Sequence, residues 1–171
     1  MGEVQIRAAT ADDLPAINDI YNHYVRFSTC TYQVEPETTE DRRAWFAEHG
    51  PNHPVIVAER AGEILGWGAL SQFKSRTGYD RTVEDSVYVR DDMLRKGIGA
   101  ALLEDLLAKA RAVPYHAVVA IISADQTPSM VLHEKFGFKL VGQLPEVGRK
   151  FGLWLDVAYM EIVLQPKELL T

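Results

Sequence analysis

Apolar residues recur at helical spacing in two segments of the chain, and helix start and stop signals mark two further helices. In the first, they return every three or four residues from Leu14 to Val25, which gives a helix one apolar face. Thr10, with Asp13 three residues later, forms the capping-box pattern that starts such a helix. The other predicted helices run from Thr38 to Gly50-Pro51, from the glycines at 97–99 through Leu102–Ala110 to Pro114, and from Thr127 to Gly137.

Strand-like runs, bounded by turn residues, fill most of the remaining chain. They lie at 4–9, 55–60, 63–73, 82–89, 117–122, 138–142 and 154–164. The run 117–122 is apolar throughout, which is typical of a strand covered on both faces. The order β-α-α-β-β-β-α-β-α-β-β predicts a mixed α/β sandwich rather than an alternating doubly wound sheet. Since no linker or repeat interrupts the 171 residues, we expect a single domain over 1–171.

Composition narrows the class of protein. Hydrophobic residues make up 47% and charged residues 25% of the chain, ordinary values for a folded soluble protein. The formal net charge is -6 and there is no basic run, so we expect no nucleic-acid partner. No apolar run approaches the ~20 residues that span a bilayer, and no signal peptide is evident. Cys30 is the only cysteine, so no internal disulfide can form, and we expect a cytoplasmic protein with no membrane partner.

The chain following Val87-Tyr88-Val89 carries the most informative chemistry. The segment Arg95-Lys96-Gly97-Ile98-Gly99-Ala100 places glycines and two cations directly before a helix. The first N–H groups of a helix have no internal partner and the helix dipole adds positive charge, so a diphosphate fits there. The glycine spacing matches neither the Rossmann nor the Walker pattern. Taken alone, the glycines could equally serve a tight strand-to-helix turn.

The order of motifs resembles the acetyl-CoA-binding core of the GNAT acetyltransferases. Over nearly the whole chain it resembles the phosphinothricin and methionine-sulfoximine acetyltransferase branch. The motifs are 31–36, 73–76 with Tyr79, 82–89, 128–129 with 132–138, and 148–152 with 154–156. The resemblance implies a mixed, mostly antiparallel central sheet flanked by helices, with a V-shaped splay for acetyl-CoA. It also implies acetyl-CoA as co-substrate and a small-molecule amine as acceptor, while the scattered histidines imply no metal.

The resemblance further implies which residues contact acetyl-CoA. The strand backbone pairs with the pantetheine arm, and the amides of the glycine loop hold the diphosphate. The implied residues are Val87, Tyr88 and Val89 on the strand, Arg95, Lys96, Gly97, Ile98, Gly99 and Ala100 in the loop, and Gln126 and Ser129 beyond them. Three positions depart from the family pattern. Leu94 stands where the family usually has Arg or Gln, Arg95 stands where it often has Gly, and Gln126 stands where it usually has Asn.

An amine that attacks a thioester must first lose a proton, which a nearby carboxylate can accept. Glu84 matches the acidic position to which this branch assigns that role; the residues alone leave open a merely polar strand position. His133 matches the position of a proton donor to the departing thiolate, and it could equally be a packing or solvated residue. No histidine is suggested near Cys30, which we interpret as structural.

The acceptor site rests on a second set of matches. Lys74, Arg76 and Tyr79 match a cluster that lines the substrate pocket of this branch, although charged loop residues are usually just solvated. Arginine can hold a carboxylate or phosphinate through two parallel hydrogen bonds, which suits an acceptor with an amine and an anionic group. Trp154 and Phe151 resemble positions of a dimer contact, so the resemblance implies a homodimer.

Three functions therefore stay open. The first is an enzyme that acetylates phosphinothricin, methionine sulfoximine or methionine sulfone. The second is a GNAT enzyme that acts on a peptide N-terminus, a lysine or a polyamine. The third is a non-catalytic acetyl-CoA sensor, against which the presence of Glu84 and His133 argues. Because fold does not fix function, the choice of substrate rests on the resemblance.

Overall fold

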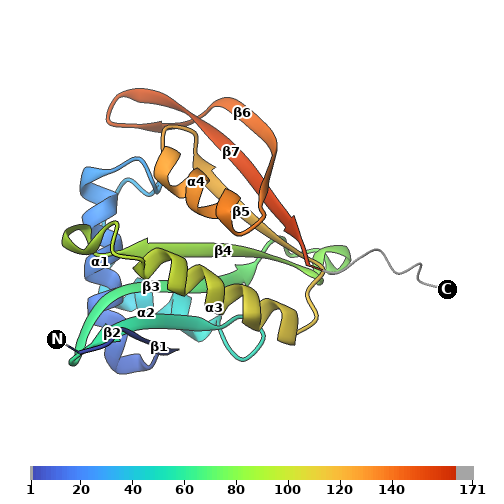
Figure 1. Cartoon of the computed structure of the whole chain (residues 1–171). Helices are drawn as coiled ribbons and strands as arrows, with labels where there is room; N and C mark the ends of the chain where they lie inside the picture. Colours follow the sequence, from blue (N-terminus) through green and yellow to red (C-terminus); the bar gives the residue numbers. More distant parts are fainter. Residues whose placement is uncertain (1, 165–171) are drawn as a thin grey trace.

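A computed structural model describes residues 2–164 of the chain (Figure 1). Its strands are β1 (Gln5–Ala8), β2 (Val55–Arg60), β3 (Glu63–Gln72), β4 (Thr82–Val89), β5 (Ala117–Ser123), β6 (Lys139–Lys150) and β7 (Leu153–Val163). Its α-helices are α1 (Leu14–Phe27), α2 (Thr39–Ala47), α3 (Ile98–Ala112) and α4 (Thr127–Lys135). No helix in this range is long and apolar enough to cross a membrane.

The described strands form one mixed sheet in the order β1-β2-β3-β4-β5-β7-β6. Every neighbouring pair is antiparallel except β4 and β5, which are parallel. Helices α3 and α4 cover one face of this sheet and α1 and α2 the other (Figure 1). The predicted mixed, mostly antiparallel sheet flanked by helices is therefore confirmed.

The two parallel strands separate after a short contact. Their pairing comprises Thr82 with Ala117, Val83 with Val118 and Glu84 with Val119. Beyond this point β4 stays paired with β3 as far as Val89, and β5 stays paired with β7. Within the described residues, the second half of β4 thus has no strand partner on its β5 side. The sheet opens there as the predicted V (Figure 1).

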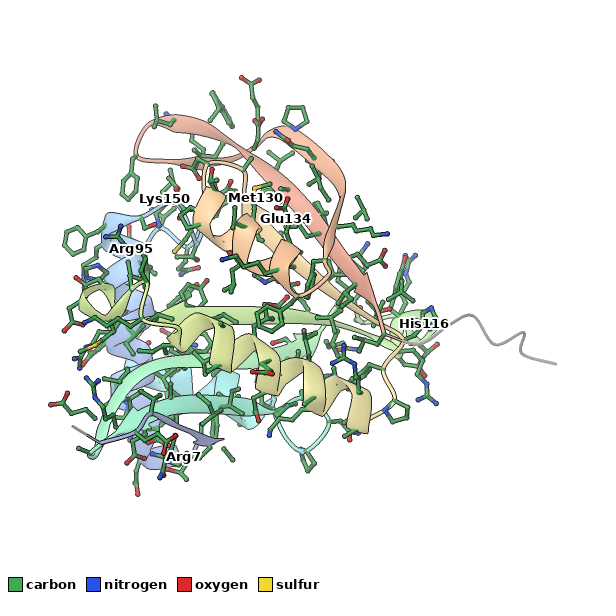
Figure 2. All side chains as sticks on the ribbon, viewed as in Figure 1. Arg7, Arg95, His116, Met130, Glu134 and Lys150 are labelled. Atoms are coloured by element: carbon green, nitrogen blue, oxygen red, sulfur yellow. The ribbon has the colours of Figure 1, made fainter. Side chains whose placement is uncertain are left out.

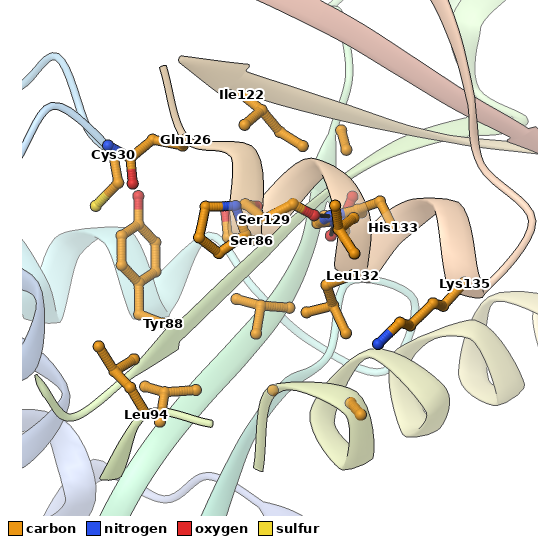
Figure 3. A pocket seen from close by; sticks show the side chains of 18 of the residues that line it. Cys30, Ser86, Tyr88, Leu94, Ile122, Gln126, Ser129, Leu132, His133 and Lys135 are labelled. Atoms are coloured by element: carbon orange, nitrogen blue, oxygen red, sulfur yellow. Dashed lines mark hydrogen bonds and ion pairs between the residues drawn. The ribbon is translucent and has the colours of Figure 1, made fainter. Parts of the chain in front are cut away.

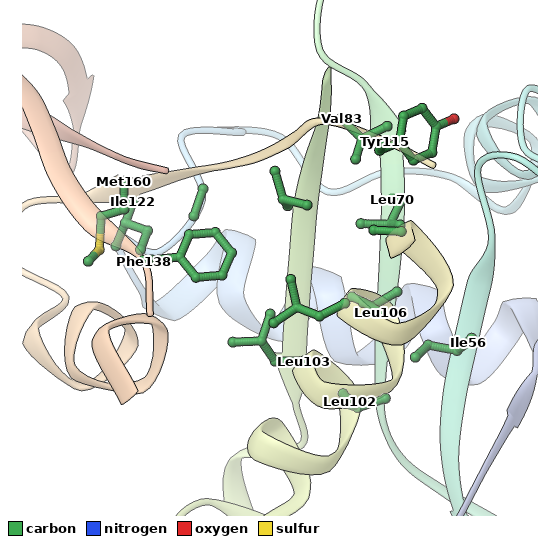
Figure 4. Packing of buried hydrophobic residues seen from close by; sticks show 14 of the residues in the cluster. Ile56, Leu70, Val83, Leu102, Leu103, Leu106, Tyr115, Ile122, Phe138 and Met160 are labelled. Atoms are coloured by element: carbon green, nitrogen blue, oxygen red, sulfur yellow. The ribbon is translucent and has the colours of Figure 1, made fainter. Parts of the chain in front are cut away.

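The larger core cluster packs α3 on the sheet. Leu102, Leu103 and Leu106 of α3 are fully buried against side chains of β2, β3, β4 and β5 (Figure 4). Each such burial contributes about 1.5–3 kcal/mol. Gly66 and Gly68 of β3 lie beneath the helix, and a Cβ at Gly68 would come 3.0 Å from the Leu106 side chain. The glycines therefore let α3 lie close to the strands.

The predicted elements agree with the structure except near the C-terminus. The capping box is present, with the Thr10 N–H donating to the Asp13 carboxylate at 2.7 Å. By contrast, β6 continues to Lys150, eight residues beyond its expected end. Two register irregularities interrupt β6 and most of its residues are exposed. The alternation of apolar and polar residues that reveals a strand is consequently absent.

Candidate active site

A cleft of about 830 Å³ occupies the opening between β4 and β5. Its walls are the splayed strands, the first turn of α3, the inner side of α4 and the segment that carries Cys30. Figure 3 shows Cys30, Tyr88 and Gln126 grouped at one part of the cleft, with His133 further along α4. The cleft is therefore built from the two sheet halves and from the helix that follows each of them.

The first turn of α3 offers free backbone donors to this cleft. Gly97 has a φ of 83° and turns the chain into the helix, a conformation that suits glycine. The Ala101 N–H bonds to the Gly97 carbonyl at 3.0 Å, so the amides of 98–100 precede the helical ladder. Gly97, Gly99 and Ala100 all line the cleft. With the helix dipole, these amides form an anion-binding end.

Successive residues of β4 direct their side chains to opposite faces of the sheet. Tyr88 lies on the α1 side, where its ring stacks on Trp67 with centroids 4.8 Å apart, and Glu84 shares this face by alternation. Val83 belongs to the core under α3, and Asp85 shares that face, where it contacts α4. Glu84 and Asp85 therefore flank the strand from opposite sides at the point where β4 leaves β5.

Glu84 has the properties of a general base. Its side chain is half-buried and lines the cleft. Burial, together with the negative charge of Asp85, raises the pKa of Glu84 from 4.5 to about 7. A carboxylate with such a pKa is ionised in a large fraction of molecules at neutral pH and holds an accepted proton well. Glu84 can thus exchange a proton with a group in the cleft.

His133 lies behind the strand in a buried ion pair. Its Nδ1 is 2.7 Å from the Ser129 carbonyl oxygen and its Nε2 is 2.9 Å from Asp85 Oδ2. Burial opposes the charged form, but the hydrogen bond and charge of Asp85, with the Ser129 carbonyl, raise the pKa of His133 overall. Both ring nitrogens are engaged, so in this arrangement neither is directed at a departing thiolate. The proton-donor role stays a prediction.

Comparison with known proteins identifies the chain's family. Residues 17–138 match the Acetyltransferase (GNAT) family. The chain belongs to this family. It is 42% identical to the L-methionine sulfoximine/L-methionine sulfone acetyltransferase of Pseudomonas aeruginosa, covering 94% of this chain and 95% of that protein. It is 39% identical to the phosphinothricin N-acetyltransferase of Streptomyces coelicolor, covering 93% and 95%.

Solved structures of GNAT proteins have the same fold. An N-acetyltransferase from Staphylococcus aureus superposes with a TM-score of 0.93 at 39% identity, covering 95% of this chain and 99% of that one. A phosphinothricin acetyltransferase from Sinorhizobium meliloti, solved in complex with acetyl-CoA, gives 0.90 at 34% identity, covering 94% and 88%. The chain is accordingly an acetyl-CoA-dependent N-acetyltransferase, and the anion-binding turn beside an open strand suits that co-substrate.

The predicted acetyl-CoA contacts of this GNAT chain divide into two groups. Most of them line the cleft: Val87, Tyr88, Val89, Arg95, Gly97, Gly99, Ala100, Gln126 and Ser129. Lys96 and Ile98 do not. The Lys96 ammonium donates to the Asp92 carbonyl at 2.9 Å, and Ile98 is buried in the core. For Ile98, therefore, only a backbone contact is compatible with the structure.

The predicted acceptor residues lie in the segment between β3 and β4, near the closed end of the V. The Lys74 ammonium lies 5.0 Å from the Phe73 ring centre and 5.2 Å from that of Tyr79. Lys74, Arg76 and Tyr79 are exposed and none lines the cleft between the strands. The structure groups Lys74 with Tyr79 around Phe73, and the acceptor-binding role of all three stays a prediction.

Lys150 supports the cleft from outside its lining, and the sequence predicts no role for it beyond its place in the motif 148–152. It is buried, and its ammonium donates to the carbonyl oxygens of Ser28 and Thr31 at 2.7 Å and of Tyr24 at 3.3 Å (Figure 2). Burial lowers its pKa. It closes the C-terminal end of α1 and anchors the segment that brings Cys30 to the cleft. A buried lysine of this kind has no distinct sequence signal.

Cys30 lines the cleft and is partly exposed. Burial raises the pKa of its thiol above the usual value, which keeps the thiol protonated and a poor nucleophile at neutral pH. The interpretation of Cys30 as structural is consistent with this chemistry.

Tyr24 is a further residue of the cleft to which the sequence assigned no functional role. Its hydroxyl donates a hydrogen bond to the Val89 carbonyl at the open end of β4.

Proposed function

We propose that this N-acetyltransferase acetylates the α-amino group of a small amino-acid-like acceptor of the phosphinothricin, methionine sulfoximine or methionine sulfone type. The observation that carries the proposal is Glu84, a base with a pKa of about 7 at the point where the cleft closes. The names of the relatives that share about 40% identity over nearly the whole chain support this acceptor class.

In this proposal, acetyl-CoA supplies the activated acetyl group when it is bound. The amides at the start of α3 hold the diphosphate, and the unpaired side of β4 from Val87 to Val89 holds the pantetheine arm as a further strand would. Glu84 accepts the proton that the acceptor amine must lose, directly or through water. Gln126 and Ser129 contact the arm from the first turn of α4. Ordered placement of amine and thioester supplies much of the acceleration.

Recognition of the acceptor's anionic group is assigned to Lys74, Arg76 and Tyr79. All three lie on the segment that precedes β4, five to ten residues before Glu84. Arg76 supplies the bidentate geometry that carboxylates and phosphinates favour. The cluster in which the Lys74 ammonium faces the Phe73 and Tyr79 rings supports a preformed cationic patch.

The enzyme is further proposed to be a cytoplasmic homodimer that needs neither metal nor nucleic acid. A single free cysteine suits a reducing compartment. The hairpin of β6 and β7 exposes a run of large apolar side chains that a monomer would leave in water. These are Leu140, Val141, Leu144, Val147, Phe151, Leu153 and Trp154.

The test measures CoA thiol release from acetyl-CoA across a panel of acceptors. The panel holds phosphinothricin, methionine sulfoximine, methionine sulfone, plain amino acids, polyamines and a lysine peptide. We expect release only with the first three, and a fall of about 100-fold or more in kcat for Glu84→Gln. Release with polyamine or peptide alone would contradict the acceptor class. Tight acetyl-CoA binding without any turnover would instead favour a sensor.

A further inference from the structure

The pair formed by His133 and Asp85 is buried more deeply than the base beside it. The side chain of His133 is 5% exposed and that of Asp85 is 1% exposed. Among the described residues, no other hydrogen bond joins α4 to β4. The pair thus links the helix on one side of the cleft to the strand on the other.

The ion pair lies where the backbone pairing between β4 and β5 ends. Asp85 is the first residue of β4 beyond the parallel pairing, which ends at Glu84. His133 belongs to α4, the helix that follows β5. Where backbone pairing between the two halves of the sheet stops, the ion pair takes over the connection. It therefore defines the closed end of the cleft on the side of α3 and α4.

The buried negative charge of Asp85 is compensated by its hydrogen bond with His133. Its second oxygen, Oδ1, is buried and has no hydrogen-bond partner among residues 2–164, so the Nε2 contact supplies the compensation that a buried charge requires. His133 must also keep the Nδ1 proton, because the Ser129 carbonyl can only accept. If His133 gave its Nε2 proton to a thiolate, Asp85 would be left as an uncompensated buried charge. Such a proton transfer is unfavourable in this geometry.

We propose that His133 and Asp85 form a clamp that fixes α4 against β4 at the closed end of the cleft, and that His133 is a positioning residue rather than the acid for the departing thiolate. The clamp also balances charge beside the base. The other titratable side chains that line the cleft are Tyr24, Cys30, Glu84, Tyr88, Arg95 and Lys135. Of these, Glu84 adjoins Asp85 and is sensitive to its charge.

The experiment compares His133→Ala, Asp85→Ala and the double variant with the native enzyme. The dissociation constant of CoA, measured by calorimetry, and Tm report on the clamp without turnover; the kinetic arm rests on the proposed function. We expect each single variant to weaken CoA binding about tenfold and to lower Tm, because α4 loses its fixed position. The double variant should be no worse than His133→Ala, since it removes the stranded carboxylate as well.

Two further variants sharpen the result. Asp85→Asn retains a hydrogen bond with neutral His133 and should keep CoA affinity near the native value. Because it removes a charge beside Glu84, the acid limb of kcat/KM should move to lower pH. Glu134→Gln, the exposed neighbour of His133 on α4 (Figure 2), is the control for a change on this helix and should alter neither readout.

A different outcome would overturn the clamp. If His133→Ala lowered kcat at saturating acetyl-CoA by about 100-fold and left the CoA dissociation constant and Tm unchanged, His133 would act as the acid. Losses of the two single variants that simply add in the double variant would show that the residues do not act together. If no acceptor in the panel is turned over, the proposed function fails, and CoA affinity and Tm still decide on the clamp.

Discussion

At the scale of single residues, Glu84, the proposed base, shows that a buried carboxyl group carries a cost for folding. Its pKa is about 7 in the folded protein, against 4.5 for a free side chain. The folded state therefore binds the proton more tightly than the unfolded state does. As the pH rises from about 4 through 7, ionising this buried group destabilises the fold. Below that range Glu84 is protonated in both states and contributes nothing.

We therefore predict that Glu84→Gln stabilises the protein, and more so at high pH. Its advantage over the native chain in the free energy of unfolding should grow between pH 4.5 and 7 and then level off. Urea denaturation at pH 4.5, 6 and 8 measures this difference. Glu134→Gln at an exposed site controls for the loss of one carboxylate. An equal effect at all three pH values would contradict the predicted origin of the shift.

At the scale of elements, the turn between β4 and α3 holds one non-glycine residue, Arg95, in a backbone conformation that such residues rarely adopt. Arg95 has a φ of 59°, the left-handed conformation that costs a residue with a Cβ roughly 1–2 kcal/mol. The resemblance noted from the sequence expects glycine at this position, and a positive φ is the conformation that glycine adopts without strain. Replacement by glycine relieves the backbone but removes a charge that lines the cleft.

Two substitutions separate these effects, because Arg95→Ala and Arg95→Gly lose the same charge but only glycine relieves the strain. We predict that Arg95→Gly is the more stable of the two by about 1 kcal/mol in urea denaturation. If the charge assists acetyl-CoA, the KM for acetyl-CoA should rise equally in both. Equal stability would indicate that the left-handed turn is not strained.

Elements with regular apolar spacing could be predicted from the residues, whereas the cleft could be expected only from the resemblance to the GNAT acetyltransferases. The strand that ends at Val89 and the glycines at 97–99 lie close together in the chain, but taken alone they fit a tight strand-to-helix turn equally well. The full length of β6 could not be predicted, because its exposed and irregular residues show no alternation. Nor could the contact between Asp85 and His133, which joins residues 48 positions apart through the packing of α4.

At the scale of the whole molecule, the hairpin of β6 and β7 exposes several large apolar side chains to solvent. Trp154 is 63% exposed and Leu153 is 59% exposed. We predict that the native protein elutes as a dimer of the 19.2 kDa chain in size-exclusion chromatography with light scattering. Trp154→Glu should shift it to monomer, because a charge in an apolar contact is costly.

Arg43→Glu on the exposed surface of α2 also changes the charge and serves as the control, which should leave the dimer intact. A native protein that runs as a monomer at micromolar concentration would contradict the proposed assembly. A dimer that survives Trp154→Glu would place the contact on another surface.

The short pairing of β4 with β5 also governs what can enter the sheet. An unpaired strand edge attracts other strands, and proteins usually protect such edges to avoid aggregation. Here the edge lies inside the molecule, in a slot with α3 and α4 on one side of it (Figure 1). Because this edge lines an internal cleft and does not lie on the outer surface, it is less exposed to pairing with strands of other proteins. Its free backbone groups are thereby kept for the ligand of the cleft.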